Sequence, residues 1–223
     1  NRRTLVLVPS LSLVSQTLSE WGRTSRHPFD ALVVCSDETV ADRSQDAAVI
    51  STSDLGVPVT TDIAAITRFL NAHRRGRSAV VFCTYQSSDR IAAAQHRSAP
   101  TFDLVIADEA HRCTGPADSL FTTVLDARKI KARRRLFMTA TPRYFTGRVK
   151  KRAAELEYEL ASMDDESRFG PVFHRLTFDA AIRDRLLTDY QVVVIGVTQA
   201  ELRQWADEAR LVRLGGTSLS PRR

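Results

Sequence analysis

The sequence predicts an α/β protein in which a parallel β-sheet is flanked by helices. Apolar runs without alternation at residues 4–8, 78–83 and 104–106 are typical of strands buried on both faces of a parallel sheet. Between these runs, apolar residues recur at helical spacing. With 223 residues, of which 43% are hydrophobic, the chain is long enough for one large domain of this class and part of another.

The elements alternate along the chain. The predicted strands are residues 4–8, 31–35, 78–83, 104–106, 136–138 and 192–195, with an edge strand at 169–173. The predicted helices have apolar faces built on Leu11 and Val14, Ile63 and Ile66, Ile91 and Ala92, Leu120 and Val124, and Phe178 and Ala181. Residues 148–159 predict a charged amphipathic helix, and residues 36–56 a long surface connection.

Composition narrows the classes of function. A formal charge of +6 favours a polyanionic partner but does not identify one. The basic residues are mostly Arg, which suits bidentate phosphate contacts, although a high-GC genome that encodes Arg in place of Lys explains this bias as well. Three separated cysteines without a Cys-x-x-Cys pair indicate neither a disulfide framework nor a zinc site. No apolar run or leader pattern indicates a membrane span or a signal peptide, so we expect no membrane partner and a cytoplasmic location. The basic run 128–135 is expected to be mostly a solvated connection, with phosphate binding as the less favoured alternative.

The predicted strand at 104–106 ends in two adjacent carboxylates, Asp108 and Glu109, followed by His111. Parallel strands present polar groups at their carboxyl ends, where phosphates and metals bind. An Asp at such a position can hold Mg²⁺, and a neighbouring Glu can deprotonate an attacking water, as NTP hydrolysis requires. The alternative is a solvated helix start, where acidic residues complement the helix dipole.

Three other predicted strands also end in polar residues. Thr139 and Thr141 follow the strand at 136–138, Pro9 and Ser10 follow the first strand, and Thr84 and Gln86 follow the strand at 78–83. Hydroxyls, an amide and the free N–H groups of a helix start are good ligands for backbone phosphates of a nucleic acid. Ordinary turns and helix caps are the alternative at each position.

The order of these motifs resembles that of a known family. Asp-Glu-Ala-His at 108–111 followed by Thr-Ala-Thr-Pro at 139–142 resembles motifs II and III of superfamily 2 helicases and translocases of the DEAD/DEAH type. Residues 8–16 resemble motif Ia, and residues 84–87 resemble motif Ib of the restriction and DNA-repair branches. Residues 138–195 resemble the motor of large single-chain restriction-modification enzymes.

The resemblance implies a RecA-like sheet and an ATP-dependent motor that moves on duplex DNA, with ATP and Mg²⁺ as cofactors. It implies that Asp108 carries Mg²⁺, that Glu109 polarises water and that His111 links the nucleotide site to motif III. Thr139 and Thr141 would then transmit the state of the γ-phosphate. The residues that would lie near the DNA backbone are Pro9, Ser10, Thr84 and Gln86.

One part of a complete motor is missing from the sequence. It contains no phosphate-binding loop of the Gly-x-x-x-x-Gly-Lys-Ser/Thr kind. We therefore expect residues 1–145 to be a first motor domain without its P-loop part, 146–190 a connection and 191–223 the start of a second RecA-like domain. By itself such a piece of a larger polypeptide is predicted to be inactive. The alternative is a non-catalytic nucleic-acid-binding module with a degenerate motor fold.

Overall fold

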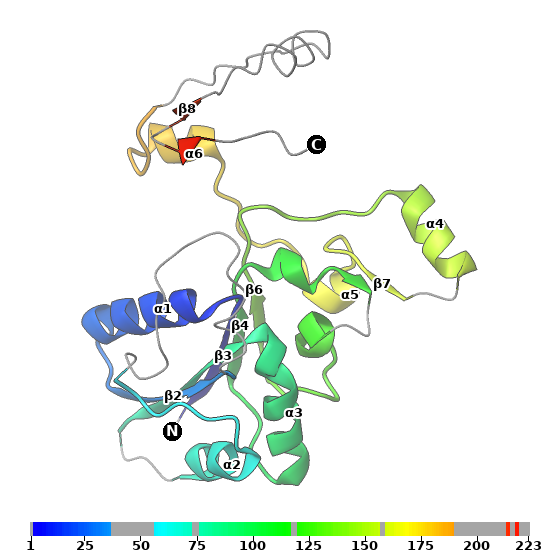
Figure 1. The fold of residues 1–223 in the computed structure, drawn as a ribbon. Helices are drawn as coiled ribbons and strands as arrows, with labels where there is room; N and C mark the ends of the chain where they lie inside the picture. The colour runs from blue at the N-terminus through cyan, green and yellow to red at the C-terminus, as the bar shows by residue number, and fades with distance from the viewer. Residues whose placement is uncertain are drawn as a thin grey trace, which may run out of the picture. The chain divides into compact units, whose positions relative to one another are not determined.

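A five-stranded parallel sheet forms the centre of the computed structural model (Figure 1), which describes residues 2–36, 56–72, 76–116, 120–156, 159–189, 213–214 and 217–218. The strand order is β2-β3-β1-β4-β6, and all four pairings are parallel. The strands are β1 (Arg3–Val8), β2 (Phe29–Val34), β3 (Ser78–Thr84), β4 (Leu104–Ala107) and β6 (Arg135–Phe137). The predicted α/β class is confirmed.

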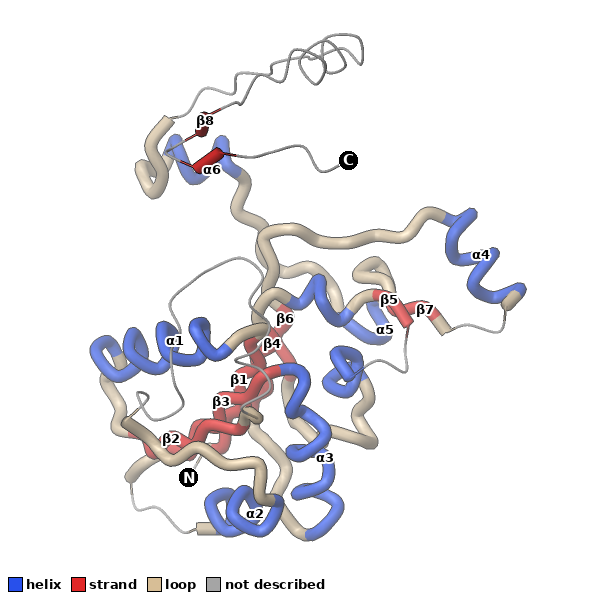
Figure 2. Tube along the Cα trace, viewed as in Figure 1, coloured by secondary structure: helices blue, strands red, loops and turns tan. Residues whose placement is uncertain are grey.

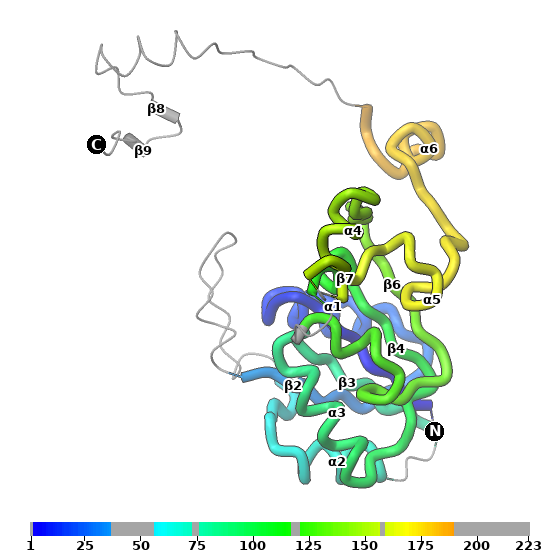
Figure 3. The backbone as a smooth tube through the Cα atoms, turned by 90° about the vertical axis from the view of Figure 1, so that its right-hand side faces the viewer, coloured from blue at the N-terminus to red at the C-terminus, as the bar shows by residue number. Residues whose placement is uncertain are grey.

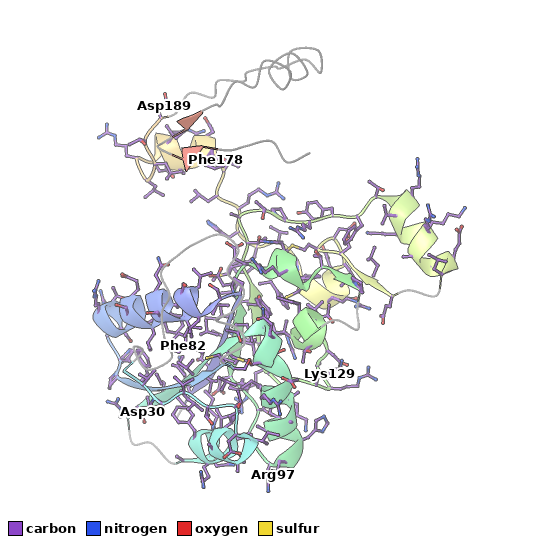
Figure 4. The ribbon with its side chains drawn as sticks, in the orientation of Figure 1. Asp30, Phe82, Arg97, Lys129, Phe178 and Asp189 are labelled. Carbon is purple, nitrogen blue, oxygen red and sulfur yellow. The ribbon has the colours of Figure 1, made fainter. Side chains whose placement is uncertain are left out.

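Helices cover both faces of the sheet (Figure 2). On one face α1 (Leu11–Thr24) packs Val14 into a cluster with Val6 and Phe82. Figure 4 labels Phe82, whose ring lies 5.7 Å from that of Trp21. The other face is covered by α2 (Ile63–Asn71) and α3 (Ser88–Arg97), which lie side by side in Figures 1 and 3. Burial on both faces explains why the strand sequences are apolar without alternation.

Side chains cap the first turns of helices α1 and α2. The hydroxyl of Ser10 accepts from the backbone N–H of Leu13, at the start of α1. The two carboxylate oxygens of Asp62 accept from Ala64 and Ala65 at 3.0 and 3.2 Å, at the start of α2. Each such bond satisfies an amide that has no partner inside the helix, and is worth about 1 kcal/mol.

The segment between β4 and β6 departs from the prediction in two ways. The residues with helical spacing at 120–125 form a 3-10 helix, η5 (Leu120–Leu125). Lys129 is exposed, as expected of a solvated basic run, and points away from the sheet in Figure 4. Arg135 is not solvated: its half-buried guanidinium donates to the carbonyls of Val124, at 3.1 Å, and Ile130. The predicted solvation was wrong for Arg135, because a run of basic residues in the sequence does not show which of them the fold places beside backbone carbonyls.

After β6 the chain forms α4 (Gly147–Glu155), the short strand β7 (Leu160–Ala161), which pairs antiparallel with β5 (Gly115–Pro116), and α5 (Glu166–Phe169). The predicted charged helix is confirmed over 147–155. The predicted edge strand at 169–173 is wrong, because Phe169 ends α5 and packs its ring 5.1 Å from Phe137. Gly170 then adopts φ 75°, and residues 171–177 have no regular structure.

The chain divides into two compact units, Asn1–Pro171 and Val172–Arg223. In the second unit, α6 (Phe178–Arg183) begins at the cap Thr177, whose hydroxyl accepts from the N–H of Ala180 at 3.2 Å. It ends earlier than its apolar pattern indicates, because Arg185 turns to φ 59° and the N–H of Leu186 bonds back to the carbonyl of Ala181. The described residues of this unit also include a two-stranded pairing of β8 (Arg213–Leu214) with β9 (Thr217–Ser218).

Several predictions concern residues outside the described ranges. These are most of the connection at 36–56 and the strand at 192–195. The proposed domain boundaries at 145 and 190, and the second RecA-like domain, therefore stay predictions. Within the described part of the chain, no helix has the length and apolar character needed to cross a membrane.

Candidate functional site at the carboxyl edge of the sheet

The sheet register brings the predicted site residues to one edge. Val8 is paired with Thr84, Leu7 with Ala107, and Ala107 with Phe137. Since the strands are parallel, the segments that follow them all leave the sheet at its carboxyl edge. Four segments therefore lie along this edge. In the order of the strands β3, β1, β4 and β6, they are residues 84–86, 9–10, 108–111 and 138–141.

The backbone of residues 108–111, here called the acidic turn, is bound by groups at the ends of three other strands. The N–H of Asp108 donates to the carbonyl of Leu7 at 2.9 Å, and the N–H of Ala110 donates to the carbonyl of Met138 at 2.8 Å. The carbonyl of Asp108 accepts from the Tyr85 hydroxyl at 2.7 Å. The turn is thus held by the ends of β1, β6 and β3.

Glu109 has a left-handed backbone, with φ 51° and ψ 44°. For a residue other than glycine this conformation costs about 1–2 kcal/mol, and it persists only where the surroundings enforce it. Here the N–H of Glu109 is bound by the carboxylate Oδ1 of Asp108 at 2.9 Å. The Glu109 side chain remains 38% exposed. Backbone strain is thus placed at the residue predicted to act on water.

His111 joins the acidic turn to the threonines after β6. Its Nδ1 lies 3.0 Å from the Thr139 hydroxyl and 3.3 Å from the Thr141 hydroxyl. The same nitrogen lies 3.2 Å from Oε2 of Glu109. Depending on the tautomer of the imidazole, Nδ1 either donates a hydrogen bond or accepts one. The imidazole can therefore bond the Glu109 carboxylate through Nδ1–H, or accept there from a threonine hydroxyl.

At the end of β3 most polar side chains face inward. Thr84 is fully buried, and its hydroxyl donates to that of Ser87 at 3.3 Å. Pro9, after β1, is also buried, whereas Ser10 and Gln86 are partly exposed. The Oε1 atom of Gln86 is buried without a hydrogen-bond partner among the described residues. Of these four residues, only Ser10 and Gln86 have side chains within reach of a ligand.

Tyr85 is a site residue that the sequence analysis did not select. Its side chain is fully buried, although it follows a strand among polar residues. Burial raises the pKa of its hydroxyl far above the usual value, so the group stays protonated and available as a donor. Beside it, burial raises the pKa of the Cys113 thiol to about 12. Tyr85 lies within the motif at 84–87, but no periodicity in the sequence shows that its side chain is buried while its neighbour Gln86 is partly exposed.

The donor set of the site limits which metal ion it can hold. Among the described residues, there is no group of three or more His, Cys, Asp and Glu side chains that could hold a metal. The described side chains therefore do not form a set of ligands of the kind that zinc or calcium requires. A partly exposed aspartate at a strand end fits Mg²⁺, which keeps several waters and is bound by one or two carboxylates together with substrate phosphates.

Comparison with known proteins gives a family. Residues 1–144 match the family model described as the type III restriction enzyme, res subunit. A probable helicase, A859L, of African swine fever virus (isolate Tick/South Africa/Pretoriuskop Pr4/1996) is 30% identical over 194 residues. That match covers 86% of this chain and 19% of the viral protein.

Two solved structures have a similar fold and sequence. One is a nuclease-deletion mutant of the Type ISP restriction-modification enzyme LlaGI in complex with a DNA substrate mimic, with 36% identity and a TM-score of 0.65 over 86% of this chain. The other is the ATP-dependent Type ISP restriction-modification enzyme LlaBIII bound to DNA, with 34% identity and a TM-score of 0.64 over 85% of this chain. The chain spans 14% and 13% of their lengths.

Proposed function

The chain belongs to the family of type III restriction enzyme res subunits, and on this basis we propose that it is part of an ATP-dependent motor that moves on duplex DNA. The fold is that of the RecA-like helicase domain found in its Type ISP relatives. The observation that carries the proposal is the acidic turn, where Asp108 and Glu109 follow β4 and His111 contacts the threonines after β6.

The residues at this edge have separate proposed roles in ATP hydrolysis. Asp108 would hold Mg²⁺, which neutralises charge that develops on the phosphates. Glu109 would orient a water and accept its proton, which requires a carboxylate that solvent can reach. His111 would report the state of Glu109 to Thr139 and Thr141, since its Nδ1 contacts all three side chains.

DNA is proposed to lie at the ends of β1 and β3. Both solved relatives are bound to DNA or to a mimic of it. Ser10 and Gln86 are partly exposed there, while Pro9 and Thr84 shape the backbone from buried positions. The net charge of +6 would add attraction that does not depend on sequence.

The remaining parts of the motor are proposed to lie in a longer polypeptide. The relatives are several times longer than the matched segment. A phosphate-binding loop and an arginine from a second motor domain would position the nucleotide, and such an arginine alone can be worth about 10³–10⁵ in rate. The isolated chain is accordingly predicted to hydrolyse ATP negligibly.

The test is Glu109→Gln in the longer polypeptide. We expect ATP affinity to stay within about twofold and turnover to fall by at least about 10²-fold, because an amide cannot accept the proton of water. The control is Glu155→Gln, the same change on the exposed helix α4, which should leave turnover unaltered. Retained turnover in Glu109→Gln would remove Glu109 from the role of base.

A further inference from the structure

We propose that Tyr85 is a positioning residue that ties the acidic turn to the end of β3, and so couples that strand end to the placement of Glu109. The proposal rests on the function proposed above, because it assigns the coupling to ATP hydrolysis. It adds a residue to the site, and a route between two parts of the sheet edge that β1 separates in the strand order.

Both polar groups of the peptide unit between Asp108 and Glu109 are bound. Its carbonyl accepts from the Tyr85 hydroxyl at 2.7 Å, and its N–H donates to the Asp108 carboxylate at 2.9 Å. The orientation of this peptide sets where the left-handed backbone of Glu109 begins. A hydrogen bond to the carbonyl therefore resists relaxation to an unstrained conformation.

The tyrosine ring is itself fixed in place. It is fully buried, and its centroid lies 5.7 Å from that of Phe121 in η5. Buried rings in a packed core leave little room for a hydroxyl to move independently of its backbone. A displacement of the chain at 84–86 would thus be carried by the ring to the carbonyl of Asp108.

Gln86, the next residue in the sequence, is the side chain through which bound DNA would act on Tyr85. Gln86 is partly exposed, and its buried Oε1 has no hydrogen-bond partner among the described residues. An unpaired buried amide oxygen is costly and favours any rearrangement that gives it a donor. The DNA backbone carries only hydrogen-bond acceptors, so it would bond the Nε2–H of Gln86 rather than Oε1. Such a contact would turn the amide and act one residue away from the tether.

The first test is amide hydrogen exchange on the 223-residue chain carrying Tyr85→Phe. Removing one hydroxyl should accelerate exchange at residues 108–113 by about tenfold or more, and leave β1 unaffected, because exchange reports local opening. Ile66→Val is the control, since it removes one methylene from the same core at a residue that is also fully buried.

Equal exchange at 108–113 in the Tyr85→Phe and Ile66→Val chains would overturn the tether. So would acceleration spread evenly over all strands, which is the result of a general loss of stability. This readout requires neither ATP nor DNA, so it decides the tether even if the proposed function fails.

The second test measures kinetics in the longer polypeptide. Tyr85→Phe should lower kcat for DNA-stimulated ATP hydrolysis by about tenfold with KM for ATP within about twofold, because misplacing a reacting group affects the chemical step. Tyr144→Phe, the same change at a side chain that is 51% exposed, should behave as the unaltered protein. Unchanged kcat in Tyr85→Phe would overturn the coupling. Absence of turnover in the unaltered polypeptide would instead contradict the proposed function.

Discussion

The ends of β3 and β4 both carry polar residues at the same edge of the sheet, but they use them in opposite ways. After β4, Asp108 and Glu109 keep their side chains partly exposed while their backbone is tied to three strands. At the end of β3, Thr84 and Tyr85 are fully buried, and they bond Ser87 in the same turn and the carbonyl of Asp108, respectively. Polar residues at the ends of strands can thus either present their side chains to a ligand or hold the backbone of the residues that do.

Among the substitutions that test this comparison, one at His111 in the acidic turn should have the largest effect on activity. His111→Ala removes the nitrogen within 3.3 Å of Glu109, Thr139 and Thr141. We expect kcat for DNA-stimulated hydrolysis in the longer polypeptide to fall by about 10²-fold, because Glu109 loses the group that orients it. His111→Gln, which can still donate or accept one bond, should recover part of the loss. Equal activity in the alanine variant and the unaltered protein would contradict the link.

Thr84→Val tests whether the hydroxyl at the end of β3 has a structural role, since it removes a buried hydroxyl with little change of shape. Loss of its bond to Ser87 should lower the free energy of unfolding by about 1 kcal/mol in a urea titration. Affinity for duplex DNA, and its dependence on salt, should not change. Gln86→Ala at the partly exposed neighbour should instead weaken DNA binding with little effect on stability. Weaker DNA binding by Thr84→Val would show that the inward-facing hydroxyl does reach the ligand.

Glu109→Gly is expected to have a smaller effect, of the opposite sign. Glycine adopts φ 51° without the strain of a side chain, so the 223-residue chain should become more stable to urea by about 0.5–1 kcal/mol. The same change at Glu155, in helix α4, should destabilise by up to about 1 kcal/mol. A loss of stability in Glu109→Gly would mean that the left-handed turn stores no strain.

Most of the sheet was predictable because burial on both faces leaves a direct signature in the sequence. Leu5, Val81 and Val105 are fully buried, and the runs that contain them are apolar without alternation. The structure brings Asp108, His111, Thr139 and Thr141 to one sheet edge, because parallel strands place their ends together, and the roles assigned to these residues stay predictions.

The sequence could not show which way individual polar side chains turn. Thr84 and Gln86 belong to the same motif, yet one is fully buried and the other partly exposed. Arg135 lies in a run of basic residues but reaches carbonyls that only the fold brings near. Tyr85 serves a peptide 23 positions away in the chain. Each of these depends on tertiary contacts, which local pattern does not encode.

The most direct measurement is ATP turnover by the longer polypeptide with and without Asp108→Asn, beside the 223-residue chain alone. If the acidic turn is one wall of a site completed elsewhere, the longer polypeptide turns over ATP, the Asp108→Asn variant does not, and the chain alone shows no Asp108-dependent turnover. Equal turnover by the longer polypeptide with and without Asp108→Asn would contradict the account.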